Sequence, residues 1–583
     1  MINMIMEAEK QIEKIIGNAY EKAVHDNSLV YVEDVCVNVE IPKDTCNGDF
    51  SSTFALTSAK KVKKSPLNIA KIIVERIELK ESFFESVEIA GPGFINFHLG
   101  KKWFEEVLDV IECEGGDYGS NDSGCGLKIM VEFVSANPTG PMHIGNARGG
   151  VLGDTLANVF LKNGYDVEKE FYVNDAGNQI HKFAVSINAR YMQLICGEDK
   201  YLFPEDGYHG DDIRELAQAV YEEYGDTLVE MDEDNRLNIM AEFGLKINIP
   251  LMKKDLKAYR IEYDNWFLES SLHDSGYIKE TIEMLTEKGL TYESEGALWL
   301  NTTKLLVEKY IREGKSQEQI DKLNLKDDVL RRANGFYTYF AADIAYHRNK
   351  FEVRKFDKVI NVWGADHYGH VARLQAALDG LGLDGSTKLV IVLMNLVNLL
   401  KDGAPVRMSK RSGKAIALRD LLDEISVDAA RYFFNSRSAS SAIDFDLDLA
   451  VKTDSDNPVY YIQYAYARIC SLFANLLPDS KELSDKFKNV DTSMLSSDSE
   501  IELIKALAQY PEILRISVDE YDPSHINRYL LSLAGSFHRF YTSNRIKGEK
   551  DDVMKARMKL AYATRVVLKN GMDILGLTAL EKM

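Results

Sequence analysis

The stretch KIMVEFV-SANPTGPMHIG-NARGG, residues 128–150, decides the fold of this chain. Residues 128–134 are apolar and β-branched, which is typical of a buried strand, and turn-forming residues follow them. A helix is expected from residue 146 to about residue 161. The first turn of a helix offers unpaired N–H groups and the positive end of the helix dipole. A strand, a tight loop and a helix start therefore predict a phosphate site.

Two side chains of this stretch can contact phosphate. His143 and Asn146 are one helical turn apart and so share a face of the helix start. An imidazole and an amide can both donate hydrogen bonds to phosphate oxygens. The alternative is that His143 only caps the helix. The preceding strand and the following Gly149 and Gly150 favour the phosphate-binding interpretation.

Two motifs carry a family resemblance. Residues 138–146 (PTGPMHIGN) resemble HIGH, the first signature of class I aminoacyl-tRNA synthetases, with Asn146 where the second histidine usually stands. Residues 406–413 (VRMSKRSG) resemble KMSKS, the second signature. Both occur in the family's order with a nucleotide-fold pattern between them. The ATP-binding residues that the resemblance implies are Pro138, Gly140, His143, Gly145, Asn146, Asp366, His367, Met408, Ser409 and Lys410, and the catalytic ones are His143, Asn146 and Lys410.

Composition sets the broad class. A chain of 583 residues needs more than one core, and 45% hydrophobic with 28% charged residues is usual for a soluble globular protein. The six cysteines form no C-x-x-C pair, so reduced thiols and a cytoplasmic location are expected. The N-terminus is acidic, unlike a signal peptide. The apolar run at residues 389–400 is too short to span a bilayer, so no membrane role is expected.

Charge is unevenly distributed. The formal net charge of −21 counts against a general nucleic-acid binder, but binding depends on the local field. Residues 401–414 hold five cations against one acid. Because no G-x-x-x-x-G-K-[ST] sequence occurs, two separate segments must hold the phosphates. Lys410 is the expected cation of the second segment, and the alternative is a solvated loop lysine.

We predict an α/β fold, a Rossmann-like parallel-sheet catalytic domain over residues 116–427. Its expected strands are residues 128–134, 166–173, 359–363 and 389–394, with ligands beyond their carboxyl ends. An N-terminal α/β domain (residues 1–115), a helical insertion at about residues 195–330 and a C-terminal all-α bundle (residues 428–583) complete the prediction.

The N-terminal region indicates which synthetase family the chain resembles. Residues 52–80 are expected to form a helix pair with a run of lysines, and such a run is usually a solvated face. Residues 48–80 and 91–97 are similar to the N-terminal domain of arginyl-tRNA synthetases, which touches the elbow of the tRNA. That resemblance makes Lys60 and Lys61 tRNA-binding candidates.

A guanidinium-binding site is indicated further along the chain. Tyr339 and Asp343 are four residues apart and share a helical face. A ring and a carboxylate suit a planar guanidinium. Core packing is an alternative for Tyr339, but it is a poor one for Asp343, because an unpaired buried carboxylate is costly. The arginine-binding residues that the resemblance implies are Asn137, Asp175, Gln179, Glu269, Tyr339, Asp343 and His367.

Two of these assignments leave alternatives open. Asp175 follows an expected strand, where it could only cap the next helix. The spacing of Asp366, His367 and His370 could suggest a metal site, but no further cysteine or carboxylate cluster accompanies them, so no metal site is expected.

Aromatic residues mark the C-terminal region. Rings at helical spacing usually pack in a core, but single-stranded RNA loops are also read by stacking on such rings. Residues 428–433 and 457–468 resemble the anticodon-binding bundle of arginyl-tRNA synthetases, and residues 579–583 resemble the family's C-terminal ending. The tRNA-binding candidates here are Tyr461, Tyr464, Arg468 and Met583.

The resemblance extends from about residue 48 to residue 583. It implies an enzyme that joins L-arginine to tRNA(Arg) through an arginyl-adenylate, with ATP and Mg²⁺. We expect a monomer, although nothing in the sequence fixes the oligomeric state. The rivals are another class I synthetase and a catalytically silent tRNA-binding protein. The silent protein should have lost His143 or Lys410, and both are present.

Lys410→Ala tests this interpretation. Removing one preorganised charge donor costs about 3–4 kcal/mol of transition-state stabilisation. Amino-acid activation should therefore slow by roughly two to three powers of ten. Single-turnover kinetics measure it, and a near-normal rate would contradict the assigned role.

Overall fold

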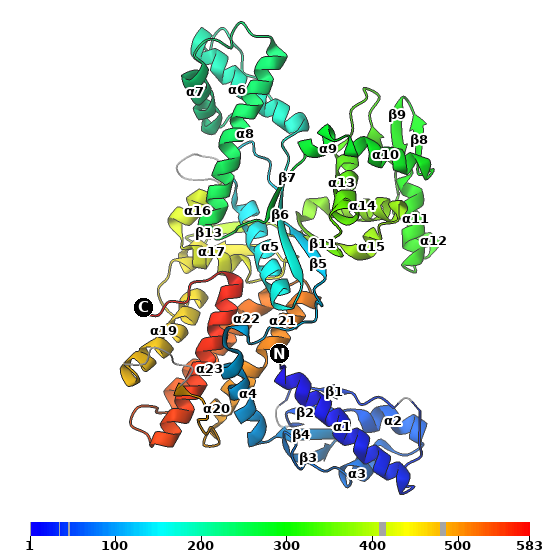
Figure 1. The fold of residues 1–583 in the computed structure, drawn as a ribbon, viewed down its shortest axis with the longest axis vertical. Helices are drawn as coiled ribbons and strands as arrows, with labels where there is room; N and C mark the ends of the chain where they lie inside the picture. Colours follow the sequence, from blue (N-terminus) through cyan, green and yellow to red (C-terminus); the bar gives the residue numbers. More distant parts are fainter. Residues whose placement is uncertain (1, 34, 45–46, 407–415, 479–485) are drawn as a thin grey trace.

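A five-stranded parallel sheet lies at the centre of the computed structural model, which describes residues 2–33, 35–44, 47–406, 416–478 and 486–583 (Figure 1). The spatial order is β12-β11-β5-β6-β7, and all neighbours are parallel. The strands are β5 (Lys128–Glu132), β6 (Asp166–Val173), β7 (Asn265–Leu268), β11 (Lys358–Gly364) and β12 (Leu389–Met394). The predicted fold class, an α/β protein with a parallel-sheet catalytic domain, is confirmed.

The chain order of the strands reverses between β5 and β11. From β5 the chain runs outward through β6 and β7, and it then returns to add β11 and β12 on the other side. In open α/β sheets the ligand crevice lies beyond the carboxyl ends of the strands at such a reversal. The residues that follow β5 and β11 therefore stand at the expected ligand site.

Strand β5 is shorter than the sequence predicts. It ends at Glu132, because Val134 and Ser135 adopt left-handed backbone angles with φ of 68° and 42°. Helix α5 (Ile144–Lys162) follows the turn and packs back on the strand. A Cβ on Gly153 would lie 2.2 Å from Cγ of Phe133, so only glycine allows this close approach.

The region expected to be one helical insertion has two parts. Helices α6 (Gly177–Cys196), α7 (Asp211–Tyr224) and α8 (Glu233–Ala258) form a projection with its own apolar core, at the top of Figure 1. Strand β7, however, joins the central sheet, with Trp266 stacked 4.2 Å from Phe171. The helical projection spans residues 177–258, and the expected insertion at residues 195–330 also includes β7 and the elements that follow it.

The segment from β7 to β11 covers one side of the sheet. Its helices are α9 (Ser270–Asp274), α10 (Tyr277–Glu287), α11 (Thr302–Arg312), α12 (Gln317–Asp321) and α13 (Tyr339–Arg348), and α13 continues into a π-helix (Asn349–Val353). Strands β8 (Thr291–Ser294), β9 (Ala297–Leu300) and β10 (Asp328–Arg331) form a small antiparallel sheet. Helices α14 (Tyr368–Leu381) and α15 (Gly385–Lys388) connect β11 to β12.

The N-terminal region is a separate α/β unit at the lower right of Figure 1. Its antiparallel sheet has the order β1-β2-β4-β3, with β1 (Val39–Glu40), β2 (Phe50–Ser52), β3 (Phe84–Ala90) and β4 (Phe94–Leu99). Three helices accompany the sheet: α1 (Met4–His25), α2 (Phe54–Val62) and α3 (Pro66–Val74). Helix α4 (Lys101–Glu114) leaves this unit and packs on the C-terminal helices.

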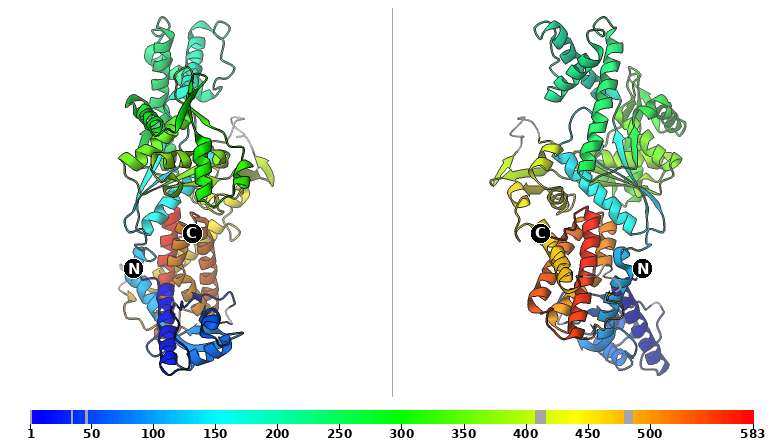
Figure 2. Two further views of the ribbon diagram at one scale, coloured as in Figure 1. Left: turned by 90° about the vertical axis from the view of Figure 1, so that its right-hand side faces the viewer. Right: turned by 60° about the vertical axis from the view of Figure 1, so that its left-hand side comes forward.

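The helical C-terminal region starts later than the expected boundary at residue 428. Strand β15 (Ile443–Asp446) pairs with β13 (Val397–Lys401), which in turn pairs with β14 (Ala404–Val406). Helices α16 (Leu418–Glu424), α17 (Val427–Phe434) and α18 (Leu447–Ala450) surround these strands. The bundle consists of α19 (Pro458–Leu476), α20 (Asp498–Ala508), α21 (Tyr510–Asp519), α22 (Ser524–Ser543) and α23 (Asp551–Leu575), seen from two sides in Figure 2. Among the described helices, none has the length and apolarity that crossing a bilayer requires.

A buried arginine joins these regions. Arg431 of α17 is fully buried and ion-pairs through Nη2 with Asp154 of α5. Its Nε donates to the carbonyl of Leu575 at 2.7 Å, and its Nη1 donates to the carbonyls of Tyr259 and Arg260 at 3.1 and 3.2 Å. Helix α5, the end of the helical projection and the end of the bundle therefore meet at one guanidinium.

Arg431→Ala should destabilise the protein strongly. Breaking a buried ion pair by removing one partner costs about 3–5 kcal/mol. Urea denaturation followed by circular dichroism measures the loss. The control is Arg515→Ala, since Arg515 makes only exposed ion pairs on α21, which are worth about 0–1 kcal/mol. Equal losses in the two variants would contradict the assignment.

Candidate active site

The start of α5 carries the first predicted phosphate contacts. His143 is its exposed N-cap residue, and Asn146 accepts the backbone N–H of His143 through Oδ1 at 3.1 Å. Because the amide oxygen of Asn146 serves the cap, its Nδ2 is the group that can donate to an anion. Gly145 is exposed on the same turn. The helix start therefore presents an imidazole, an amide N–H pair and backbone N–H groups.

The loop before α5 is tied to its surroundings. Pro138 is buried, and its carbonyl accepts a hydrogen bond from Nδ2 of Asn248 in α8 at 2.8 Å. Gly140 is half-buried, and Asn137 is exposed. The helical projection thus contacts the loop directly, so α8 helps to hold the loop over the end of the sheet.

Most of the second signature, residues 407–413, lies outside the described residues, including Met408, Ser409 and Lys410. The chain after them pairs with the first signature: the N–H of Ile144 donates to the carbonyl of Ile416 at 3.3 Å, and the N–H of Leu418 donates to the carbonyl of Met142 at 2.7 Å. The structure therefore joins the two signature regions through backbone hydrogen bonds.

Asp366 and His367 stand on the other side of the strand reversal. Both belong to the 3₁₀ turn Ala365–His367 that follows β11, and their side chains are exposed. His367 Nε2 lies 3.7 Å from a carboxylate oxygen of Asp366, and the His367 ring lies 5.7 Å from the ring of Trp363. Since β11 is the neighbour of β5, this turn and the start of α5 flank the same crevice.

A buried carboxylate follows β7. Glu269 is 3% exposed. The Asn174 amide forms hydrogen bonds when its nitrogen faces Glu269, and Nδ2 of Asn174 then donates to Oε2 of Glu269 at 3.1 Å. Asp175 accepts the N–H of Ser270 at 2.9 Å and the hydroxyl of Ser270 at 2.6 Å. One oxygen of Asp175 therefore binds the backbone of Ser270 and the other binds its hydroxyl, next to Glu269, whereas α6, the next helix, has no side-chain cap.

Tyr172 brings the acids into one group. Burial raises the pKa of its hydroxyl, and the negative charges of Glu269 and Asp343 raise that pKa further. Asp343 accepts a hydrogen bond at 2.8 Å from Nε2 of His370. His273 lies 3.6 Å from Glu269, and its hydrogen bond to that carboxylate raises the pKa of His273. Tyr172, His273 and the pairing of Asp343 with His370 were not identified from the sequence, because these contacts join separate elements.

Tyr339 is half-exposed, which excludes the core-packing interpretation. As the first residue of α13, it lies against the start of α6, where a Cβ on Gly177 would be 3.8 Å from its ring. Gln179 of α6 accepts a hydrogen bond from the hydroxyl of Tyr208. An accessible ring near the carboxylates of Glu269 and Asp343 is an arrangement that suits a planar cation.

Within the described ranges, no three His, Cys, Asp or Glu side chains are grouped so that they could hold a metal ion. Asp343 and His370 pair with each other instead.

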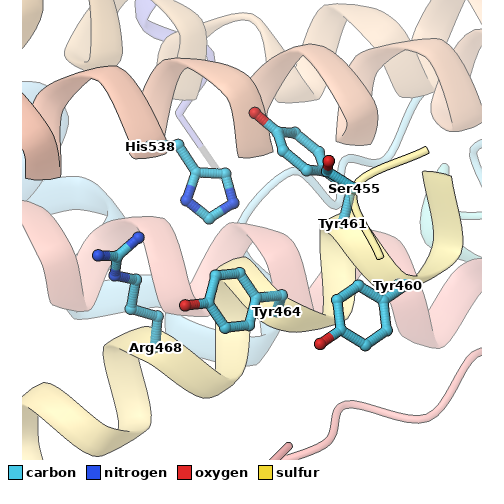
Figure 3. A pocket seen from close by; sticks show the side chains of 6 residues that line it. All are labelled: Ser455, Tyr460, Tyr461, Tyr464, Arg468 and His538. Carbon is cyan, nitrogen blue, oxygen red and sulfur yellow. The ribbon is translucent and has the colours of Figure 1, made fainter. Parts of the chain in front are cut away.

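A second site lies on the C-terminal bundle. Tyr460, Tyr461, Tyr464 and Arg468 of α19 line a hollow of about 280 Å³ with His538 of α22 and Ser455 (Figure 3). The rings of Tyr460 and Tyr464 stack at 6.1 Å, and those of Tyr464 and His538 at 5.7 Å. Arg468 lies 4.3 Å above the ring of Tyr541. These rings face a pocket and are not all core, so flat ligands can stack there.

His538 was not identified from the sequence, because it approaches Tyr464 only through the packing of α22 on α19. Burial lowers the pKa of its imidazole. Of the other predicted RNA contacts, Met583 is 49% exposed and lies outside the residues that line this pocket. Lys60 and Lys61 are exposed at the end of α2.

A buried histidine lies beneath the active site. His347 of α13 is 1% exposed, and its Nδ1 lies 2.8 Å from the carbonyl oxygen of Asp343. Burial and, next, the charge of Lys350 hold its pKa well below the usual range. The folded protein therefore keeps this imidazole neutral.

Comparisons with known proteins cover almost the whole chain. Three family models match: arginyl tRNA synthetase N terminal domain over residues 10–99, tRNA synthetases class I (R), catalytic domain, over residues 113–446, and DALR anticodon binding domain over residues 462–583. The arginine–tRNA ligase of Acetivibrio thermocellus is 49% identical over 583 residues, covering 100% of both chains. That of Caldanaerobacter subterraneus subsp. tengcongensis is 48% identical over 586 residues, again covering 100% of both.

The fold also has solved counterparts. The arginyl-tRNA synthetase of Thermus thermophilus superimposes with a TM-score of 0.73, covering 98% of this chain and 100% of that chain. At 20% identity this likeness concerns the fold alone.

The neutral His347 predicts a pH-dependent stability. The unfolded chain protonates this imidazole below its ordinary pKa of about 6.5, whereas the folded protein does not. Its stabilising contribution is therefore complete above about pH 6.5 and is lost as the pH falls. Between pH 6 and 5, wild-type stability should fall about 1.2 kcal/mol more than that of His347→Gln. Urea midpoints across this range measure it, and parallel curves would contradict it.

Proposed function

Because the chain belongs to the arginyl-tRNA synthetase family, and as an arginine–tRNA ligase uses ATP to charge tRNA for protein synthesis, we propose that arginine is activated in the crevice beyond β5 and β11. One observation carries this proposal. Buried Glu269 and partly exposed Asp343 lie near Tyr172 and the exposed ring of Tyr339, at the same end of the sheet as His143. A guanidinium and a triphosphate therefore find complementary surfaces side by side.

On the arginine side, Glu269 is the main guanidinium partner in this proposal. Both oxygens of Asp175 already hold Ser270, so Asp175 acts by positioning the backbone beside Glu269. Asp343 carries a second negative charge, shared with His370. Tyr339 offers a face on which the guanidinium stacks. Asn137, Gln179 and His367 complete the proposed arginine contacts.

On the ATP side, the start of α5 holds the phosphates. His143, Asn146 and Gly145 present donors there, and Pro138 and Gly140 shape the loop. Asp366 and His367 contact the nucleotide from the turn after β11. Lys410, with Met408 and Ser409, supplies the second half of the clamp, and the pairing of Ile416 with Ile144 supports its approach to the same site.

The reaction needs alignment more than reactive side chains. A carboxylate oxygen of arginine bonds to the α-phosphorus of ATP, and the bond from that phosphorus to the bridging oxygen breaks, so pyrophosphate leaves. No protein nucleophile or strong base takes part, and the gain comes from orientation and charge stabilisation. The terminal adenosine 2′-hydroxyl then takes the arginyl group and AMP leaves.

Magnesium is part of the proposal only as a companion of ATP. The described residues offer no three-ligand group for a metal, so they do not fit a cage built by the protein. Mg²⁺ is commonly held by substrate phosphates with few protein ligands.

The proposed RNA contacts lie at two places. A splayed base stacks on the rings of Tyr461, Tyr464 and His538, with Arg468 nearby, since single-stranded RNA is recognised in this way. Met583 contributes at the chain end. Lys60 and Lys61 contact the tRNA backbone from α2. We also propose a cytoplasmic monomer, a location supported by the free state of the five described cysteines.

ATP–pyrophosphate exchange with a panel of amino acids, with and without tRNA, tests the function. Of the amino acids in the panel, only arginine should support exchange. The exchange should also require tRNA, as the family resemblance implies. Exchange driven by a different amino acid would overturn the assignment.

Glu269→Gln tests the guanidinium site in the same assay. Losing a charge-assisted hydrogen bond costs about 1.5–3 kcal/mol, so the KM for arginine should rise roughly 10- to 150-fold while the KM for ATP stays constant. Asp274→Asn is the control, because Asp274 is an exposed acid on the same short helix. An unchanged arginine KM in Glu269→Gln would remove Glu269 from the site.

A further inference from the structure

A chain of buried polar side chains lies beneath the crevice, and none of them belongs to the proposed substrate contacts. Lys350 and Asn361 are 0% exposed, His347 is 1% exposed and Glu132 is 5% exposed. They come from α13 and its π-helical continuation, from β11 and from the end of β5. Buried charges are costly unless they are paired and hydrogen-bonded, so the arrangement of their partners matters.

From Lys350 to Asp343, each hydrogen bond in this series of buried side chains is donated toward the Asp343 carbonyl. The carbonyl of Asp343 can only accept, so Nδ1 of His347 carries the proton and donates at 2.8 Å. Nε2 of His347 then accepts from Nδ2 of Asn361 at 2.8 Å. Oδ1 of Asn361 accepts from the ammonium of Lys350 at 3.3 Å, and the same ammonium pairs with Oε2 of Glu132 at 2.5 Å.

The other end of this chain reaches the turn after β5. Oε1 of Glu132 accepts the hydroxyl of Ser135 at 3.0 Å, and that hydroxyl accepts the N–H of Tyr172 at 3.2 Å. Val134 and Ser135 are both left-handed, which is strained for residues with a Cβ and especially for a β-branched one. Such strain costs about 1–3 kcal/mol for each residue and persists only where surrounding contacts hold it.

We propose that Lys350 is a positioning residue for amino-acid activation. Through Glu132 and Ser135 it holds the strained turn from which the loop to His143 departs, and through Asn361 and His347 it holds the backbone of Asp343. One buried ammonium thus fixes the spacing between the phosphate-binding loop and the guanidinium site. Its place in a π-helix agrees with this role, since π-helical turns often occur at functional sites. The inference rests on the proposed arginine and ATP sites.

The first test compares two buried lysines. Lys559 is 1% exposed and pairs with Glu112 at 2.9 Å between α23 and α4, away from the crevice. Lys350→Met and Lys559→Met each remove a buried ammonium, so both should lower stability. Per folded enzyme, Lys350→Met should lower the kcat of arginine-dependent exchange by at least about tenfold, and Lys559→Met should stay within about threefold of wild type.

The second test keeps every buried charge. Ser135→Ala removes only the hydroxyl that links the turn to Glu132, so kcat should fall while the arginine KM changes by less than about threefold. Adding Val134→Gly should recover part of the lost kcat, because glycine adopts a positive φ without strain. A merely structural role would not produce this rescue.

The outcomes separate the two proposals. If the wild-type protein shows no arginine-dependent exchange, the proposed function fails. If the wild type is active but Lys350→Met or Ser135→Ala keeps its kcat, the positioning role of Lys350 is overturned. Equal kcat losses in the two lysine variants would overturn it as well, and so would the absence of rescue by Val134→Gly.

Discussion

The burial of one guanidinium constrains how the large parts of this molecule assemble. Arg431 has no access to water, so its donors must meet acceptors from α5, from the end of the helical projection and from the end of the bundle. Asp428, one turn earlier, ion-pairs with Arg260 and accepts from Gln463 of α19. Helix α5, which His143 caps, and helix α19, which carries the tyrosine pocket, are therefore both bonded to residues of α17. The proposed active site and the tyrosine pocket are therefore connected through Arg431 and Asp428.

Around these contacts, local electrostatics matter more than the net charge of −21. The start of α5 offers N–H groups and the positive end of a dipole, which attract phosphate. A short distance along the sheet edge, the carboxylates of Glu269 and Asp343 near Tyr172 form the proposed site for a cation. The two surfaces have opposite sign, as the two substrates do. The backbone between the two proposed surfaces includes the left-handed turn at Val134 and Ser135, and the buried polar side chains below it contact that turn through Glu132.

The site also shows how two carboxylate side chains acquire different surroundings. Asp175 and Glu269 are both acids near the ends of neighbouring strands. Asp175 spends both oxygens on the backbone and hydroxyl of Ser270, whereas Glu269 is buried beside Tyr172 and an asparagine amide. Likewise, Asn146 uses its oxygen to cap α5, and only its nitrogen can serve an anion. The atoms of a side chain that already form hydrogen bonds within the protein determine which of its atoms can still bind a substrate.

The sequence by itself determined the features that are local. Hydrophobic runs predicted β6, β11 and β12 closely, two short motifs indicated the nucleotide site, and helical spacing put Tyr339 and Asp343 on one face. Only the tertiary structure decided that β7 joins the central sheet, that β15 pairs with β13, and that Tyr172, His370 and His538 stand beside the predicted residues. Periodicity reports which face of one element is buried, but strand pairing and side-chain hydrogen bonds between distant segments depend on how whole elements pack, and no local pattern encodes that packing.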